Sequence, residues 1–138
     1  MAIICDIDDT LLRNGTQPIE RTIAYVNDQH SRTAVILVTG RPESQRIATV
    51  RALKAAGVKY NRLIMNPGST ANSNAYKYET ALRLKQSTNI TMAIDNNEDA
   101  RRAYRRAGIK NVVNPSSLPD LKKFWNYFFV RHSHSQVK

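Results

Sequence analysis

The sequence predicts an α/β fold, a Rossmann-like three-layer sandwich in which a mostly parallel sheet lies between two layers of helices. Short apolar runs rich in β-branched residues alternate with segments whose apolar residues recur every three or four positions. Polar residues follow several of the apolar runs, and glycine follows two of the periodic segments. Strands that alternate with helices in this way pair in parallel, with helices on both faces of the sheet.

Five apolar runs are predicted to be buried strands because each is short and rich in β-forming residues. In chain order they cover residues 2–7, 34–38, 62–65, 91–94 and 111–113. Each run is followed by a polar or turn-forming segment. The runs are therefore the predicted strands of the mostly parallel sheet.

Helices are predicted between the strands because apolar residues spaced three and four apart share one helix face. The periodic segments are 19–26, 47–53, 78–82 and 100–107, and a last one follows Pro119 at 121–128. Gly57 and Gly108 come directly after two of them, where a left-handed residue commonly ends a helix. Residues 66–75 lack a periodic pattern and are expected to form a polar loop.

The length and composition indicate one domain. With 138 residues, of which 41% are hydrophobic, the chain can bury one core, and we place the domain at 1–130, followed by a basic tail at 131–138. No apolar run approaches the roughly 20 residues of a membrane-spanning helix, and the start of the chain lacks the pattern of a secretion signal. The single cysteine, Cys5, cannot form an internal disulfide. We therefore expect a cytoplasmic protein that does not bind a membrane.

The charge is strongly positive. The chain has 21 Lys and Arg against 11 Asp and Glu, a formal net charge of +10. Such a chain attracts polyanions, including nucleic acids. Charge alone does not separate nucleic-acid binding from an ordinary basic surface.

Acidic and polar residues follow the predicted strands at the edge where open parallel sheets bind ligands. Asp6 and Asp8 follow the first strand and are two apart, so their carboxylates leave the chain on the same side and would repel unless a cation lay between them. Asp95 follows the fourth strand and can complete an all-oxygen Mg²⁺ site. Thr39 can donate to a phosphoryl oxygen, and Lys77 can neutralise its charge. Each residue alone could be a helix cap or a surface residue, but their convergence at one edge indicates phosphate chemistry.

The segments ICDIDDTLL, VTGRP and AIDNNEDA, with Lys77 between the last two, resemble the four motifs of the haloacid dehalogenase (HAD) superfamily, in order. The resemblance implies that Asp6 is the nucleophile of an aspartyl-phosphate mechanism and that Asp8 is the general acid and base. It implies Mg²⁺ as cofactor, with a set of metal ligands formed by Asp6, Asp8, Asp95 and Asp99. The fourth motif has Asn96 where many relatives have a second aspartate; Asp99 is the expected substitute, and Asn96 itself is the alternative. Lys85 is a weaker alternative to Lys77.

Three residues within the first two motifs are expected to contact the substrate: Thr10, Gly40 and Arg41. Many relatives carry an inserted cap domain, but the segments between the motifs here leave no room for one, so we expect a minimal cap or none and an open site. Receiver domains of signalling proteins use similar residues, but their accepting Asp ends the third strand, and 62–66 contains no Asp. Cys5 as a phosphatase nucleophile fails because no arginine follows at the short spacing that a phosphate-binding loop requires.

The chain also resembles the phosphatase domains of phage polynucleotide kinase-phosphatases, at AIDNNEDARRAYRRAGI and at the TGR of the second motif. This resemblance implies removal of 3′-phosphates from nucleic-acid ends. Arg101 and Arg105, on the outer side of the fourth helix together with Arg102 and Arg106, are expected to contact the nucleic-acid backbone, although a solvated face is an equally simple interpretation. No GxxxxGK loop occurs, so a kinase or ligase would be a separate partner. The alternatives are a small-molecule phosphatase such as a nucleotidase and a non-enzymatic nucleic-acid-binding protein.

Overall fold

The computed structural model describes residues 1–68 and 73–121. Its centre is a parallel sheet in the order β5-β4-β1-β6-β7. The strands are β1 (Ala2–Cys5), β4 (Ala34–Pro42), β5 (Arg62–Asn66), β6 (Ile90–Ile94) and β7 (Val112–Val113). All five predicted strands are confirmed, and β4 extends further than its apolar run.

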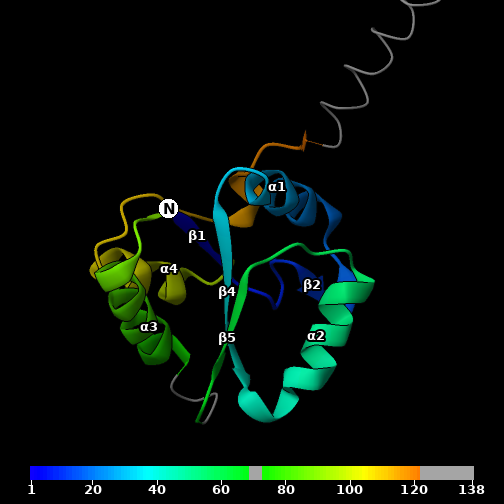
Figure 1. The fold of residues 1–138 in the computed structure, drawn as a ribbon, viewed down its shortest axis with the longest axis horizontal. Helices are drawn as coiled ribbons and strands as arrows, with labels where there is room; N and C mark the ends of the chain where they lie inside the picture. The colour runs from blue at the N-terminus through cyan, green and yellow to red at the C-terminus, as the bar shows by residue number, and fades with distance from the viewer. Residues whose placement is uncertain (69–72, 122–138) are drawn as a thin grey trace, which may run out of the picture.

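Helices cover both faces of this sheet, which confirms the predicted three-layer sandwich. They are α1 (Glu20–His30), α2 (Arg46–Ala55), α3 (Ser73–Ser87) and α4 (Glu98–Arg106), with short 3₁₀ turns at Glu43–Gln45 and Pro115–Ser117. Figure 1 shows α1 and α2 on one side of the sheet and α3 and α4 on the other. The predicted last helix lies outside the described residues after Leu121, as does the tail at 131–138. None of the described helices has the length and apolar character that crossing a lipid bilayer requires.

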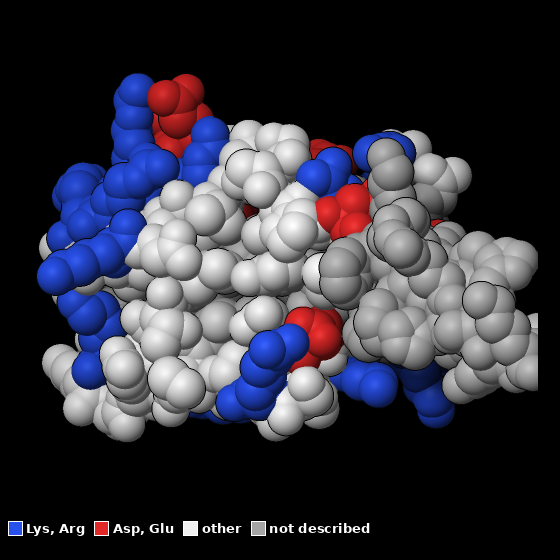
Figure 2. All heavy atoms as spheres, turned by 90° about the horizontal axis from the view of Figure 1, so that it is seen from above, with Lys and Arg blue, Asp and Glu red and all other residues white. Residues whose placement is uncertain are grey.

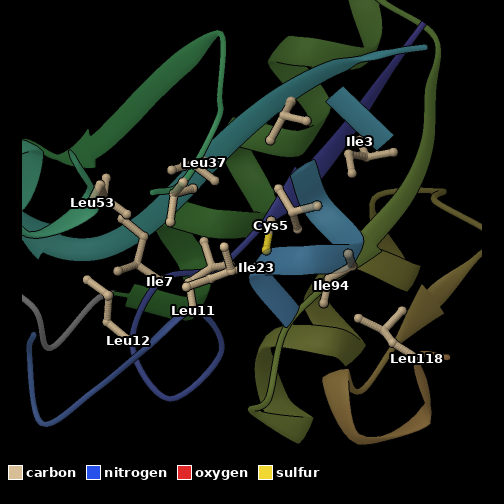
Figure 3. Close-up of a cluster of buried hydrophobic side chains, with 13 residues drawn as sticks. Ile3, Cys5, Ile7, Leu11, Leu12, Ile23, Leu37, Leu53, Ile94 and Leu118 are labelled. Carbon is tan, nitrogen blue, oxygen red and sulfur yellow. The ribbon is translucent and has the colours of Figure 1, made fainter. Parts of the chain in front are cut away.

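The core has two halves because successive residues of a strand point to opposite faces. In β1, Ile3 and Cys5 pack with the cluster under α1 and α2, while Ala2 and Ile4 pack with the cluster under α3 and α4. Figure 3 shows the first cluster, in which Ile23 of α1 and Leu53 of α2 lie against the sheet. Strand β1 is therefore buried on both faces, which fixes the residues that follow it.

The helix ends agree with the glycine pattern. Gly57 and Gly108 follow α2 and α4 with φ angles of +74° and +96°. This left-handed conformation, which is costly for other residues, ends a helix by turning the chain away. Both predicted glycine stops are confirmed.

Two local predictions were incomplete. A two-stranded hairpin, β2 (Leu12–Arg13) and β3 (Gln17–Pro18), follows the first motif and was not predicted. Strands of two residues are too short to show a periodic pattern, although the Asn-Gly pair at its turn is a hairpin signal. The predicted loop at 66–75 is also too long, because α3 begins at Ser73. Between β1 and β4 the chain forms only this hairpin and α1, in agreement with a minimal cap.

Candidate active site

The predicted site residues gather where the order of the strands reverses. From β1 the chain builds outward through β4 and β5, and then places β6 on the other side of β1. Ligands of open parallel sheets bind at such a reversal, beyond the carboxyl ends of the strands. A cavity of about 450 Å³ opens there, and Asp6, Asp8, Lys77 and Asn96 line it.

A buried cluster of charges forms the floor of this site. Lys77 Nζ lies 3.3 Å from Asp6 Oδ1 and 2.8 Å from Asp95 Oδ2. All three residues are buried, with 5%, 4% and 0% of their surface exposed for Lys77, Asp6 and Asp95. One ammonium between two carboxylates leaves a formal charge of −1 in a region that water hardly reaches. Such a charge is costly unless further positive charge approaches it.

The protonation behaviour follows from this arrangement. Burial, together with the repulsion of Asp95, raises the pKa of Asp6 to about 7, although Lys77 opposes the rise. Burial alone would lower the pKa of Lys77, but the attraction of Asp6 and Asp95 prevails and raises it above its ordinary value. The lysine therefore stays charged. A cation beside Asp6 would favour its ionised form, the form that can attack phosphorus.

The Asn96 side chain lies beside Asp6 at a spacing that suits neighbouring ligands of Mg²⁺. The terminal side-chain atom of Asn96 that faces the site lies 3.1 Å from Asp6 Oδ2 and 3.0 Å from the main-chain oxygen of Asp8. Neighbouring ligands of an octahedral Mg²⁺ lie about 3 Å apart, because the metal–oxygen distance is about 2.1 Å. With the amide oxygen of Asn96 in this position, it forms an all-oxygen set with Asp6 Oδ2 and the main-chain oxygen of Asp8, and this set suits Mg²⁺. With the amide nitrogen there, the nitrogen donates hydrogen bonds to those two oxygens instead. The residues therefore fit Mg²⁺ in one of the two amide orientations.

The set of four aspartates predicted from the sequence is not assembled. No group of three or more Asp, Glu, His or Cys side chains that could hold a metal occurs in the part of the chain that the structure describes. The Asp8 carboxylate faces Arg41, and that of Asp95 accepts from Lys77 and from the backbone N–H of Asn97. The side chain of Asp99 is 71% exposed and faces Arg102. The first turn of α4 directs the Asp99 side chain outward and leaves Asn96 beside Asp6, and the role of Asp99 as a metal ligand stays a prediction.

Asp8 lies at the rim of the cavity, held by Arg41. Its carboxylate accepts hydrogen bonds from Arg41 Nε at 3.0 and 3.1 Å and from Nη2 at 2.7 Å. The same guanidinium donates to Thr49 Oγ1 of α2 and to the carbonyl of Gly15 at the hairpin turn. Half of the Asp8 side chain is exposed, so it can reach a ligand in the cavity.

The structure shows what three further motif residues contact: Thr10, Thr39 and Gly40. The hydroxyl of Thr10 is buried and donates to Asp6 Oδ2 over 3.1 Å, so it positions Asp6 rather than facing the cavity. Thr39 is fully buried, and its Oγ1 accepts from the backbone N–H of Arg41 over 3.1 Å. Gly40 lines the cavity, and a Cβ there would overlap the hydroxyl of Ser73. Thr10 thus contacts Asp6, and its expected contact with the substrate stays a prediction.

The two arginines expected at the substrate do not line the cavity. Arg101 donates to the carbonyl of Asp95 over 3.0 Å, and Arg105 donates to that of Val112 over 3.4 Å. The outer-side position of all four arginines is confirmed, since Ala100, Ala103, Tyr104 and Ala107 are buried. Local acceptors hold Arg101 and Arg105, whereas Arg102 and Arg106 line a neighbouring groove. The contact of Arg101 and Arg105 with a nucleic-acid backbone stays a prediction, since these hydrogen bonds do not test it.

Several residues of the cavity were missed. Ser73 and Asn74 line it from the start of α3, within the segment predicted to be a loop, and Gln45 lines it from the turn before α2. Asn97 also lines it and caps α4 by accepting from Ala100 N over 2.9 Å. An asparagine before a helical segment is a cap signal, and it was available in the sequence.

The competing residues lie elsewhere. Lys85 donates to the carbonyl of Ala107 over 2.9 Å and lines a hollow of about 700 Å³ near the start of β6, which no carboxylate lines. Its distance from Asp6 therefore favours Lys77 for the lysine role. Cys5 is completely buried, and burial raises the pKa of its thiol well above the usual range. A buried neutral thiol is a poor nucleophile.

Comparisons with known proteins find one matching family model and several similar structures. A family model described as HAD superfamily, subfamily IIIB (acid phosphatase), matches residues 15–117. A structure of the Pnkp1/Rnl/Hen1 RNA repair complex is similar, with a TM-score of 0.68, 23% identity, and coverage of 82% of this chain and 42% of that one. A second structure of the Pnkp1/Rnl/Hen1 complex gives a TM-score of 0.65, 25% identity, and coverage of 82% and 45%. The chain thus spans less than half the length of the chains it resembles. No curated protein sequence matched.

Proposed function

The chain belongs to the HAD superfamily, subfamily IIIB (acid phosphatase), and from this premise we propose that it is a Mg²⁺-dependent phosphomonoesterase that removes 3′-phosphates from nucleic-acid ends. The observation that carries the proposed chemistry is the buried lysine between two carboxylates, Asp6 and Asp95, beside the half-exposed Asp8. The family match begins at residue 15, after Asp6 and Asp8. The roles of these two aspartates therefore rest on the geometry and on the motif.

We assign the nucleophile to Asp6. Its carboxylate oxygen forms a bond to phosphorus while the bond from phosphorus to the ester oxygen breaks. Asp8, in its protonated form, gives its proton to the departing ester oxygen. In the second half, the Asp8 carboxylate takes a proton from water, the water oxygen attacks phosphorus, and the bond to Asp6 breaks, which releases inorganic phosphate.

Positive charge around the phosphoryl group is needed because the buried cluster is negative before any ligand binds. Lys77 supplies one charge from below, and its contact to Asp95 holds it in place. Asp6, the main-chain oxygen of Asp8 and Asn96 would hold Mg²⁺, which supplies neutralisation of the phosphoryl oxygens and favours ionised Asp6. Arg41 lines the cavity at the side of Asp8 and can donate to the phosphate.

The substrate is inferred from charge, access and similarity together. A net charge of +10 attracts a polyanion, and the absence of an inserted domain between the motifs leaves room for a long one. The similar structures include the Pnkp1/Rnl/Hen1 RNA repair complex, which supports nucleic-acid ends as substrates. We propose that a kinase or ligase acts together with this domain, since residues 1–138 contain no kinase phosphate loop.

The test compares three substrates with one preparation: a 3′-phosphorylated oligonucleotide, the matching 3′-mononucleotide and an aryl phosphate. We expect kcat/KM to be highest for the oligonucleotide, all activity to need Mg²⁺, and Asp6→Asn to abolish turnover of all three. A higher kcat/KM for the mononucleotide would favour a nucleotidase instead. Substantial turnover by Asp6→Asn would exclude Asp6 as the nucleophile.

A further inference from the structure

A groove between α3 and α4 lies next to the active-site cavity on the outside of the molecule. It encloses about 400 Å³, and its polar and aromatic lining comprises Asn74, Tyr78, Glu79, Asp99, Arg102 and Arg106. Asn74 lines both the groove and the cavity. A chain whose end lies beside Asp6 can therefore continue into the groove. We propose, on the basis of the function proposed above, that this groove binds the single-stranded nucleotides preceding the terminal phosphate.

The groove carries a flat platform for a nucleobase. The guanidinium carbon of Arg106 lies 4.9 Å from the centroid of the Tyr78 ring, a stacked cation–π pair. Proteins that bind single strands stack bases on aromatic rings and on arginine planes. Tyr78 lies one helical turn from Asn74, so the platform is about 6 Å further along α3 from the cavity. This places the platform next to the end of a bound strand.

Arg102 is the side chain best placed to contact a backbone phosphate. Two-thirds of it is exposed, and it lies 3.0 Å from Glu98 and 3.9 Å from Asp99. Exposed ion pairs of this kind contribute little to stability, so a phosphate can replace these carboxylates. Arg101 and Arg105 differ, because backbone carbonyls already hold their guanidinium groups. The four arginines of α4 therefore divide into an internal pair and a pair that faces the groove.

The charge of this side of the molecule fits a polyanion. Outside the active-site pair Lys77 and Asp95, residues 73–110 contain seven Lys and Arg against three Asp and Glu. Figure 2 shows basic side chains gathered on the side where α3 and α4 lie in Figure 1. The groove itself is lined by two arginines and by two carboxylates, those of Glu79 and Asp99. This local balance favours a strand held by stacking and a few phosphates over the dense charge of a duplex.

The experiment measures kcat/KM for a short 3′-phosphorylated single-stranded oligonucleotide and for an aryl phosphate. Tyr78→Leu keeps an apolar side chain but removes the ring, and it should lower kcat/KM for the oligonucleotide about tenfold, which corresponds to about 1.4 kcal/mol of lost stacking. Tyr78→Phe keeps the ring and should retain the parent value. The double variant Arg102→Ala/Arg106→Ala should lose at least as much as Tyr78→Leu. An aryl phosphate is too small to reach the groove, so its turnover by each variant should stay within about twofold of the parent value.

A matched control removes the same charge from another face. Arg51→Ala/Lys54→Ala changes two exposed residues of α2, on the opposite side of the sheet, and should change oligonucleotide cleavage little. Equal losses in this control and in the groove variants would overturn the proposal in favour of general attraction. Equal losses for both substrates would overturn it too, as would an unchanged oligonucleotide value in every groove variant. If the parent does not prefer the oligonucleotide to the mononucleotide, the proposed substrate fails first and the groove with it.

Discussion

The Asp6 carboxylate should lower the stability of the metal-free protein at neutral pH, so that Asp6→Asn inactivates the enzyme but stabilises its fold. The pKa of Asp6 is about 7 in the folded protein against an ordinary value of 3.8. Between these values the unfolded chain has lost the proton while the folded chain retains it. Raising the pH through this window therefore favours unfolding, and the full penalty is present above pH 7.

The size of the effect follows from the shift. About 3 pKa units at about 1.4 kcal/mol each give an upper limit of about 4 kcal/mol. Asparagine has nearly the same shape but cannot ionise, and it leaves Lys77 paired with Asp95 alone. It also gives up the ion pair to Lys77 and weakens the hydrogen bond from Thr10. We therefore expect a net gain of about 2 kcal/mol above pH 7, or roughly 5–10 °C in Tm.

The assay is thermal unfolding followed by circular dichroism, with a chelator present, at pH 8 and pH 5. The gain of Asp6→Asn over the parent should shrink by more than half at pH 5, where folded Asp6 carries its proton. Glu79→Gln removes an exposed carboxylate and should give no comparable gain. Adding Mg²⁺ at pH 8 should raise the Tm of the parent much more than that of Asp6→Asn, because a ligand stabilises the state that binds it. An Asn variant less stable than the parent at pH 8, or a gain independent of pH, would refute this reasoning.

The remaining predictions concern the lysine and the metal. Lys77→Ala leaves the carboxylates of Asp6 and Asp95 buried without a cation, and should therefore lower the free energy of unfolding by about 3–5 kcal/mol. It should also lower aryl phosphate turnover by at least about 100-fold. Lys85→Ala removes only a contact at the end of α4 and should keep turnover within about twofold, with a loss of about 1 kcal/mol. Asn96→Ala should raise the Mg²⁺ concentration for half-maximal activity about tenfold or more, whereas Asp99→Ala should change it little. A larger increase of this Mg²⁺ concentration for Asp99→Ala than for Asn96→Ala would favour Asp99 as the metal ligand.

The sheet and its helices could be predicted because their signals are repeated along the chain. A parallel strand buried on both faces needs a continuous apolar run, as in Ala2–Cys5. The site could be predicted in part for a related reason, since parallel strands bring their carboxyl ends to one edge. The hairpin of β2 and β3 could not, because two residues do not establish a period. Such an element is defined by its turn and by its contacts.

The orientation of individual side chains was the least predictable part. Helical periodicity places Arg101 and Arg102 on the same outer side, but it does not reveal that a carbonyl holds the first and that the second faces a groove. Likewise, the chain offers Asn96 and Asp99 as alternative oxygen ligands at nearly the same sequence position. Asn97 caps α4, and this cap sets where the helix begins and therefore where Asp99 points. Local acceptors and caps decide these questions, and their effect appears only when the backbone path is known.

The net charge of the chain and the charge of the buried active-site cluster have opposite signs. Attraction of a polyanion and attack on its phosphate therefore have different electrostatic requirements. The chain carries +10, yet the buried cluster of Asp6, Asp95 and Lys77 carries a formal −1. The surface charge can attract a polyanion, but it acts through water and is screened within about 10 Å at moderate salt. A doubly charged phosphate at Asp6 would still meet a negative floor. The surface charge can thus draw a polyanion toward the cavity, and the two positive charges of Mg²⁺ would turn the floor from −1 to +1 and make attack by a carboxylate on a phosphate dianion possible.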